Sequence, residues 1–244
     1  MRRHVSLVLS ILLWVVALPA VSALAPATAA SVPATAARDD PPYTILLPYA
    51  ANDPCGPFDD PFDDNTAGWF IGQSGDLRAE ISGGEYRLRF STPGMVWTVP
   101  APVCPRANYA AAVDARWGNA TGGNFIGLLF ALDDNREQLA QPRGLLLAVN
   151  TNVRRWMVFE VRGGDLRTVI APTGHDAIKP GQATNRLAAE RAGERILLAI
   201  NGTQVGELTG VGTATPVLAG VVVAAYTSQT STDARFDNFS WHGR

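Results

Sequence analysis

Short stretches in which alternate residues are apolar run through most of this chain, and turn-forming residues separate them. No segment shows the spacing of a convincing amphipathic helix. Gly83-Gly84, Gly163-Gly164 and Asn201-Gly202 stand between such stretches, and these pairs supply the positive φ angles of tight hairpins. The expected strands are Leu77–Ser82, Glu85–Phe90, Asn108–Trp117, Phe125–Leu132, Gly144–Asn150, Arg155–Arg162, Asp165–Ile170, Arg186–Arg191, Glu194–Ile200, Thr203–Leu208, Val217–Tyr226 and Ala234–Trp241. The pattern predicts an all-β fold, a two-sheet antiparallel β-sandwich of the jelly-roll type.

The first 25 residues follow a different pattern. Arg2 and Arg3 precede a largely apolar run, Val5–Leu18, which Pro19 and small residues follow. This order of charged, apolar and small residues is typical of a secretory signal peptide. An uncleaved anchor is the alternative, because Val5–Ala25 is just long enough to cross a bilayer. We expect an exported protein, secreted or extracytoplasmic at the cell surface or in the periplasm, with no membrane span after signal cleavage.

An Ala-, Thr- and Pro-rich linker with a lead-in strand at Tyr43–Leu47 is expected over residues 26–53, and the folded domain over residues 54–244. Hydrophobic residues make up 47 % of the 244-residue chain and charged residues 17 %, which is enough apolar material for a packed core. The formal net charge is −2, and the signal peptide would remove two further positive charges. A mildly acidic domain argues against a nucleic-acid partner, which requires a basic surface.

The chain contains two cysteines, Cys55 and Cys104. An even pair in an exported protein predicts one disulfide bond. Closing a loop of about fifty residues would contribute roughly 4 kcal/mol by restricting the unfolded chain. Two cysteines cannot supply a four-ligand zinc site, and the histidines are scattered along the sequence.

Several short motifs resemble a known superfamily. In chain order they are Phe125–Phe130 leading into Asp133-Asp134-Asn135, Ala177–Gly181, Asn185–Leu187, Ile200–Gly202 and the terminal Arg235–Phe239. Their order looks like the concanavalin A-like lectin/glucanase sandwich, in its laminin G-like and bacterial extracellular domain-of-unknown-function branches. The resemblance covers roughly Cys55 to His242. It implies two curved antiparallel sheets, of which the concave face often binds glycans. A fold does not by itself establish a function.

Alternation along two expected strands suggests a binding face. In Asn108–Trp117 the apolar residues occupy one face, while Asp114 and Arg116 share the other. In Arg155–Arg162 one face combines an indole ring with charged groups, which suits stacking on a sugar ring and bonding to its hydroxyls. The expected ligand-binding residues are Trp156, Glu160, Arg162, Asp114, Arg116 and Trp97. On this hypothesis Trp156→Ala abolishes binding and leaves the melting temperature unchanged. The alternative is that the tryptophans simply pack in the core.

The favoured function is a non-catalytic module that binds a polysaccharide or glycoprotein. One alternative is a glycoside hydrolase that uses Asp114 and Glu160 from neighbouring strands, although the Glu-x-Asp-x-Glu strand of such enzymes is missing. Another is a structural envelope or protein-partner module, favoured by a concave face lined with Ala and Val. Gly72–Asp76 resembles a serine-nucleophile motif, but Asp76 replaces the final glycine and no helix is expected after it.

Calcium is the one cofactor that the sequence suggests. The resemblance implies an ion at the rim of the sandwich, and Asp133, Asp134 and Asn135 place oxygen ligands in one expected loop. A second group of acidic residues occupies Asp59–Asn65. The competing explanation is that Asp and Asn simply favour turns, where their side chains bond nearby backbone amides.

Overall fold

The computed structural model describes residues 43–45, 56–119, 124–133, 143–162, 165–210, 216–225 and 232–244. Residues Asp40–Arg244 form one compact unit, and Met1–Asp39 form a separate one that contains no described residue. The expected signal peptide therefore lies outside the described residues, as does all of the expected linker except Tyr43–Ile45. Within the described ranges, no helix is long and apolar enough to cross a membrane.

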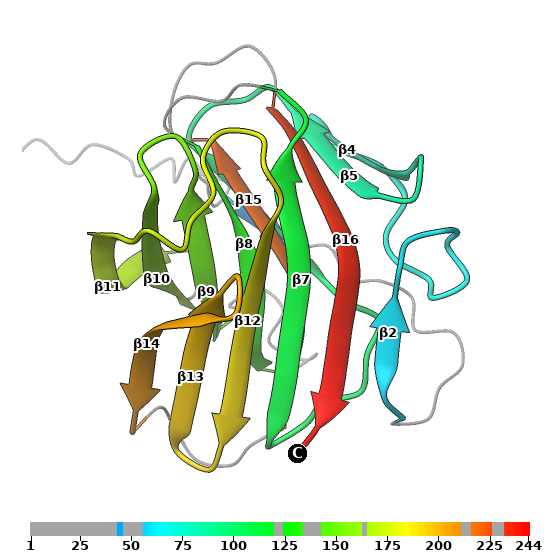
Figure 1. Ribbon diagram of the computed structural model, residues 1–244. Helices are drawn as coiled ribbons and strands as arrows, with labels where there is room; N and C mark the ends of the chain where they lie inside the picture. The colour runs from blue at the N-terminus through cyan, green and yellow to red at the C-terminus, as the bar shows by residue number, and fades with distance from the viewer. Residues whose placement is uncertain are drawn as a thin grey trace, which may run out of the picture. The chain divides into compact units, whose positions relative to one another are not determined.

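The strands pack as two sheets (Figure 1). In the described part of the chain, the seven-stranded sheet consists, in spatial order, of β1 (Tyr43–Ile45), β6 (Met95–Pro100), β15 (Val217–Ala225), β8 (Phe125–Asp133), β9 (Arg143–Asn150), β10 (Arg155–Arg162) and β11 (Asp165–Gly174). The nine-stranded sheet consists of β14 (Thr203–Thr209), β13 (Arg195–Ile200), β12 (Asn185–Ala192), β7 (Tyr109–Trp117), β16 (Thr232–Gly243), β5 (Tyr86–Phe90), β4 (Leu77–Ile81) and β3 (Gly72–Ser74), with β2 (Phe58–Asp60) also paired to β16. The predicted all-β sandwich is confirmed.

The core lies between the two sheets, because each sheet turns one apolar face toward the other. Along β7 buried residues alternate strictly with partly exposed ones, as a strand with one solvated face requires. Contacts between described residues join the inner faces across the sandwich. The rings of Phe90 on β5 and Trp97 on β6 meet edge to face at 6.5 Å, and the indole of Trp156 on β10 lies against Gly206 on β14.

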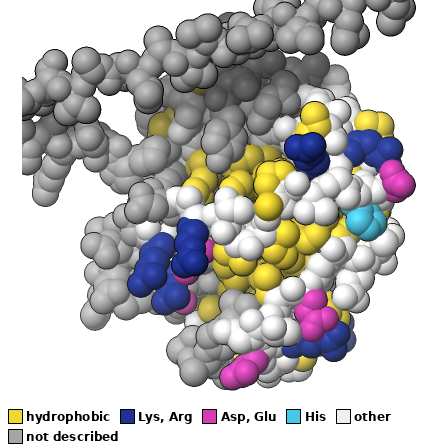
Figure 2. Space-filling view, turned by 90° about the vertical axis from the view of Figure 1, so that its left-hand side faces the viewer, with side chains coloured by type: hydrophobic (Ala, Val, Ile, Leu, Met, Phe, Trp, Pro, Cys, Tyr) yellow, Lys and Arg dark blue, Asp and Glu magenta, His cyan; other side chains and the backbone are white. Residues whose placement is uncertain are grey.

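The two outer faces differ in chemistry. Every side chain of β15 is buried, on both faces of its sheet, and the central strand β9 offers Gly144, Leu146 and Ala148 on its outer side. Figure 2 looks onto the side of the molecule where β11 and β14 lie, and there hydrophobic side chains gather in the middle with charged groups at the margins. The outer sides of the described strands β9 and β15 are therefore apolar, whereas polar residues alternate along the nine-stranded sheet, as in β7.

A buried carboxylate fixes the loop between β2 and β3. Asp60 Oδ2 accepts a hydrogen bond from Trp69 Nε1 and its Oδ1 accepts one from Phe62 N, both at 2.8 Å. The rings of Phe62, Trp69 and Tyr86 pack around this carboxylate with centroid separations of 5.1 to 5.5 Å. Phe62 has a φ of 57°, a conformation that costs a non-glycine residue of the order of 1 kcal/mol or more. The hydrogen bonds that Asp60 accepts hold the loop in this strained form.

Candidate functional site

Polar side chains cover the outer face of the nine-stranded sheet. They alternate with buried residues along β4, β5, β16, β7 and β12, three of which lie side by side at the front of Figure 1. We call this surface the polar sheet face, and its residues are Arg78, Glu80, Glu85, Arg87, Arg89, Asp114, Arg116, Arg186, Asp233, Arg235, Asp237, Asn238 and Ser240. Of these, the sequence-based prediction found Asp114 and Arg116. Two more, Arg87 and Arg89, could have been found from the alternation of apolar and charged residues in Tyr86–Phe90.

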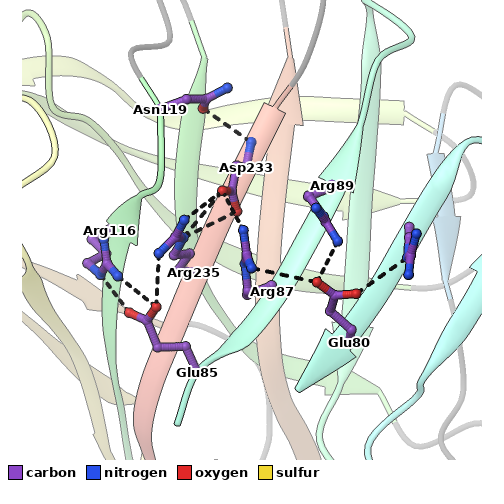
Figure 3. A network of polar contacts seen from close by, with 9 residues as sticks. Glu80, Glu85, Arg87, Arg89, Arg116, Asn119, Asp233 and Arg235 are labelled. Atoms are coloured by element: carbon purple, nitrogen blue, oxygen red, sulfur yellow. Dashed lines mark hydrogen bonds and ion pairs between the residues drawn. The ribbon is translucent and has the colours of Figure 1, made fainter. Parts of the chain in front are cut away.

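Ion pairs link three adjacent strands at the middle of this face (Figure 3). Arg116 and Arg235 stand directly opposite each other on β7 and β16, and Glu85 accepts hydrogen bonds from both. The two Arg116 bonds are 2.6 Å long and the Arg235 bond is 3.3 Å. Asp233 accepts a 2.9 Å bond from Arg235 and another of the same length from Arg87 on β5. Bidentate and shared contacts of this kind hold the guanidinium planes in fixed orientations.

Gly118 makes room for the Asp233 pair. A Cβ atom at this position would lie 2.3 Å from Asp233 Oδ2 and 2.4 Å from Arg235 Nε. Desolvation by burial raises the pKa of Asp233, but hydrogen bonds and charges from Arg235 and Arg87 outweigh it and hold the pKa below its ordinary value. The carboxylate is therefore ionised at neutral pH and committed to the two arginines.

Replacing Asp233 with asparagine is expected to lower the free energy of unfolding at neutral pH by about 2 kcal/mol, because two guanidiniums lose a charged partner. The lowered pKa means that the folded protein binds this proton less readily than the unfolded chain. The stabilisation is therefore present above the ordinary value of 3.8 and is lost as the pH falls through the lowered pKa. Urea unfolding should show the wild-type advantage shrinking from about pH 6 to about pH 3. An advantage that stays constant over this range would contradict the assignment.

A β-bulge interrupts the polar sheet face where β16 passes β7. The register between these strands shifts between Asp237 and Ser240, and Asn238 there has a φ of 50°. Asn238 Nδ2 donates to Asp114 Oδ2 at 3.0 Å, and Arg186 on β12 donates to Asp114 Oδ1 at 3.4 Å. Arg186 also donates to Asn238 O at 2.5 Å and to Ser240 Oγ at 3.2 Å. The bulge thus gathers donors and acceptors from three strands.

Asp237 stands directly opposite Asp114 across the bulged pair of strands. Desolvation by burial is the main cause that raises the pKa of Asp237, and the nearby carboxylates of Asp114, Glu85 and Asp63 raise it further. Its Oδ1 accepts a hydrogen bond from Asn238 N at 2.7 Å, which lowers the pKa in part. Asp237 therefore helps to hold the bulge in shape.

The expected exposure of two tryptophans was wrong. Trp156 is 4 % exposed and Trp97 is 3 % exposed, and both point into the core between the sheets. The period-two pattern of Arg155–Arg162 was misleading because both faces of β10 carry apolar residues in this sheet, so alternation did not identify the solvent side. Neither indole can stack on a sugar at the surface.

The charged residues of the expected face fall on two different sheets. Asp114 and Arg116 lie on β7 of the nine-stranded sheet, whereas Glu160 and Arg162 lie on β10 of the seven-stranded sheet. Glu160 pairs instead with Arg143 at 3.2 Å on its own sheet. The structure therefore does not bring Asp114 and Glu160 onto neighbouring strands, and this removes the hydrolase mechanism that depends on that pair.

The calcium and disulfide predictions fall partly outside the described residues. Asp134, Asn135 and Cys55 are not described, so both remain predictions. Asp133 ends β8 at the surface, and burial raises its pKa although Arg143 lowers it in part. In the Asp59–Asn65 loop, the carboxylate of Asp60 is buried and accepts hydrogen bonds from Phe62 N and Trp69 Nε1. Among the residues that are described, no three His, Cys, Asp or Glu side chains are grouped so as to hold a metal ion.

Comparisons with known proteins identify the fold of this chain. No family model matches the chain, and no curated protein matches it. Among solved structures, a Bacillus licheniformis β-glucanase aligns over 78 % of this chain and 99 % of its own with a TM-score of 0.58 and 14 % identity. A Bacillus subtilis protein of unknown function with a galectin-like fold aligns over 77 % of this chain and 96 % of its own, with a TM-score of 0.55 and 13 % identity. A prokaryotic β-1,3-1,4-glucanase (lichenase) from a mouse hindgut metagenome aligns over 78 % of this chain and 100 % of its own, with a TM-score of 0.53 and 12 % identity.

These likenesses establish a concanavalin A-like sandwich, a fold that glycoside hydrolases share with a protein of unknown function. At such low identity no residue role can be transferred from them.

Proposed function

We propose that the chain is an exported, non-catalytic carbohydrate-binding module of the laminin G-like type, and that its polysaccharide or glycoprotein ligand lies across the polar sheet face. One observation carries the proposal: arginine, carboxylate, amide and hydroxyl groups from five adjacent strands form a single surface of fixed donors and acceptors. Ala110, Ala112 and Ala188 lie beside them and leave the surface low enough for an extended ligand. Sugars are recognised by such preset hydrogen-bonding groups. The charged, apolar and small residues at the N-terminus support export.

The contacts of three carboxylates on this face favour binding over catalysis. Glu85 and Asp233 are held by arginines, and Asp114 is engaged by Arg186 and Asn238. A general acid must carry a proton at the working pH, and the lowered pKa of Asp233 keeps that carboxylate charged. The outer side of β9 carries Gly144, Leu146 and Ala148, so this central strand places no carboxylate on that face.

Arg186→Gln is expected to weaken polysaccharide binding about tenfold, because Arg186 ties β12 to the bulge on β16 and presents a guanidinium at its surface. Affinity electrophoresis and pull-down on insoluble polysaccharides, with a glycan array to widen the ligand set, would measure this. Arg195→Gln is the matched control, since Arg195 carries the same charge on the same sheet but bonds to Glu207 on the distant β14.

Two results would contradict the proposal. One is equal binding by the Arg186 and Arg195 variants. The other is release of reducing ends from a polysaccharide by the wild type with loss of that activity in Asp237→Asn. The second result would point to Asp114 and Asp237, which face each other on β7 and β16, as a hydrolytic pair.

A further inference from the structure

Three arginines converge on one carboxylate at the β4–β5 hairpin. Glu80 lies 2.5 Å from Arg89 Nη2, 3.4 Å from Arg78 Nε and 3.7 Å from Arg87 Nη1 (Figure 3). We call these four residues the hairpin cluster. With three positive charges and one negative charge, the cluster carries a local charge of +2, on a chain whose overall formal charge is −2.

The neighbouring part of the polar sheet face is balanced by comparison. There Arg116 and Arg235 stand against Glu85 and Asp233, so two guanidiniums meet two carboxylates. Arg87 lies closer to Asp233, at 2.9 Å, than to Glu80, at 3.7 Å, so it belongs to both groups. Across the network five arginines meet three carboxylates, and Arg78 and Arg89 at the hairpin share the single carboxylate of Glu80.

This excess works against the stability of the hairpin. Arg78 on β4 and Arg89 on β5 are direct cross-strand partners, and like charges in that position repel each other. The Nε atoms of Arg87 and Arg89 are buried and find no hydrogen-bond partner within the described part of the chain. The partly exposed side chains of Arg78 and Arg89 can therefore take a further anion that the described residues do not supply.

We infer that the hairpin cluster is an anion subsite, and that the ligand of the polar sheet face is an acidic polysaccharide carrying carboxylate or sulfate groups. This inference rests on the proposed carbohydrate-binding function. The planar fork of a guanidinium matches both anions and can bond them through two nitrogens. The side chains of Arg78 and Arg89 are 66 % and 36 % exposed, so a ligand can reach them from solvent.

The test measures binding of the full chain to two matched pairs of soluble polymers by affinity electrophoresis. Polygalacturonate is compared with its methyl ester, and dextran sulfate with dextran, so that each pair differs only in the anionic group. Arg78→Gln is expected to weaken binding to the acidic member about three- to fivefold, as an exposed charge contact would. Glu80→Gln is expected to strengthen it by a similar factor, because it removes the carboxylate that competes with the ligand. Arg195→Gln, which makes the same charge change as Arg78→Gln, should leave both unchanged.

The two pairs distinguish a carboxylate ligand from a sulfate ligand. The expected effects of the Arg78 and Glu80 variants need appear with only one of the two acidic polymers, and that polymer identifies the anion. Glu80→Gln also tests whether the hairpin cluster only stabilises the sheet. In that case the loss of Glu80 would weaken binding, whereas an anion subsite predicts stronger binding. Equal binding to the acidic and neutral members, insensitive to Arg78 and Glu80, would overturn the anion subsite and leave the carbohydrate-binding function standing. Failure to bind any polymer of either pair, or any glycan in the wider array, would overturn both.

Discussion

Trp156→Ala is expected to destabilise the domain by about 3–5 kcal/mol, which is the usual cost of deleting a large aromatic side chain from a packed core. The indole is 4 % exposed and bridges the two sheets, lying between β10 and the glycine at position 206 on β14. Its removal leaves a cavity that strands held in two hydrogen-bonded sheets cannot close. Urea or thermal unfolding would measure the loss. Val153→Ala is the control, because Val153 is 58 % exposed and its truncation should change stability by less than about 0.5 kcal/mol.

Two further variants test the packing itself. A Cβ atom at Gly206 would lie 2.5 Å from Trp156 Cη2, so Gly206→Ala should destabilise the wild type and cost much less when Trp156 is already alanine. Trp156→Phe should cost less than Trp156→Ala, because it keeps an aromatic ring and leaves a smaller cavity. The Nε1 group that is lost with the indole has no hydrogen-bond partner in the described structure. A Trp156→Ala variant with unchanged stability and lost sugar binding would restore the surface hypothesis and refute the core assignment.

Asp60→Ala is expected to lower the free energy of unfolding by about 3 kcal/mol. The substitution leaves two buried donors, Trp69 Nε1 and Phe62 N, without an acceptor, and each orphaned donor costs about 1–3 kcal/mol. The substitution also removes the unfavourable desolvation of the buried carboxylate, which offsets part of this cost. Equilibrium unfolding followed by tryptophan fluorescence would report both the stability and the environment of Trp69. Asp63→Ala is the control, because Asp63 is exposed in the same loop.

The pH dependence of Asp60 has the opposite sign to that of Asp233. Burial is the main cause that raises the pKa of Asp60, and hydrogen bonds from Phe62 and Trp69 offset it only in part. The folded protein therefore binds this proton more readily than the unfolded chain, so the contribution of Asp60 to stability is greatest below the ordinary value of 3.8 and is lost as the pH rises through the raised pKa. The stability of wild type relative to Asp60→Asn should grow on acidification, and a difference that shrinks would contradict the assignment.

The fold was largely predictable because the strands are marked locally. Gly83 and Gly84 both have positive φ angles, as does Asn201, so the hairpins form where the turn residues require them. The burial pattern of β7 alternates as its sequence predicts, since one side of this strand faces solvent. These features depend on neighbouring residues in the chain, which are visible without a structure.

The site was less predictable because it depends on which strands lie side by side. Asp114 and Arg116 were placed on the solvent side of β7, but their partners Glu85, Asp237 and Arg186 come from strands far along the chain. Trp156 was misassigned because alternation cannot tell the inner face from the outer one in a sheet whose central strands are apolar on both sides. Pairing between distant strands is information that a single sequence does not display.

The position of β16 in the sheet has a consequence for the order in which the chain can fold. It is the last strand in the sequence, yet it lies between β7 and β5 and connects the β3–β4–β5 group to the rest of the nine-stranded sheet. A chain that ends before Thr232 has both halves of this sheet but no strand to join them. Such distant pairings are slow to form and must wait until both partners are available. A ribosome-bound chain therefore cannot join the two parts of the nine-stranded sheet until Thr232–Gly243 has emerged from the ribosome.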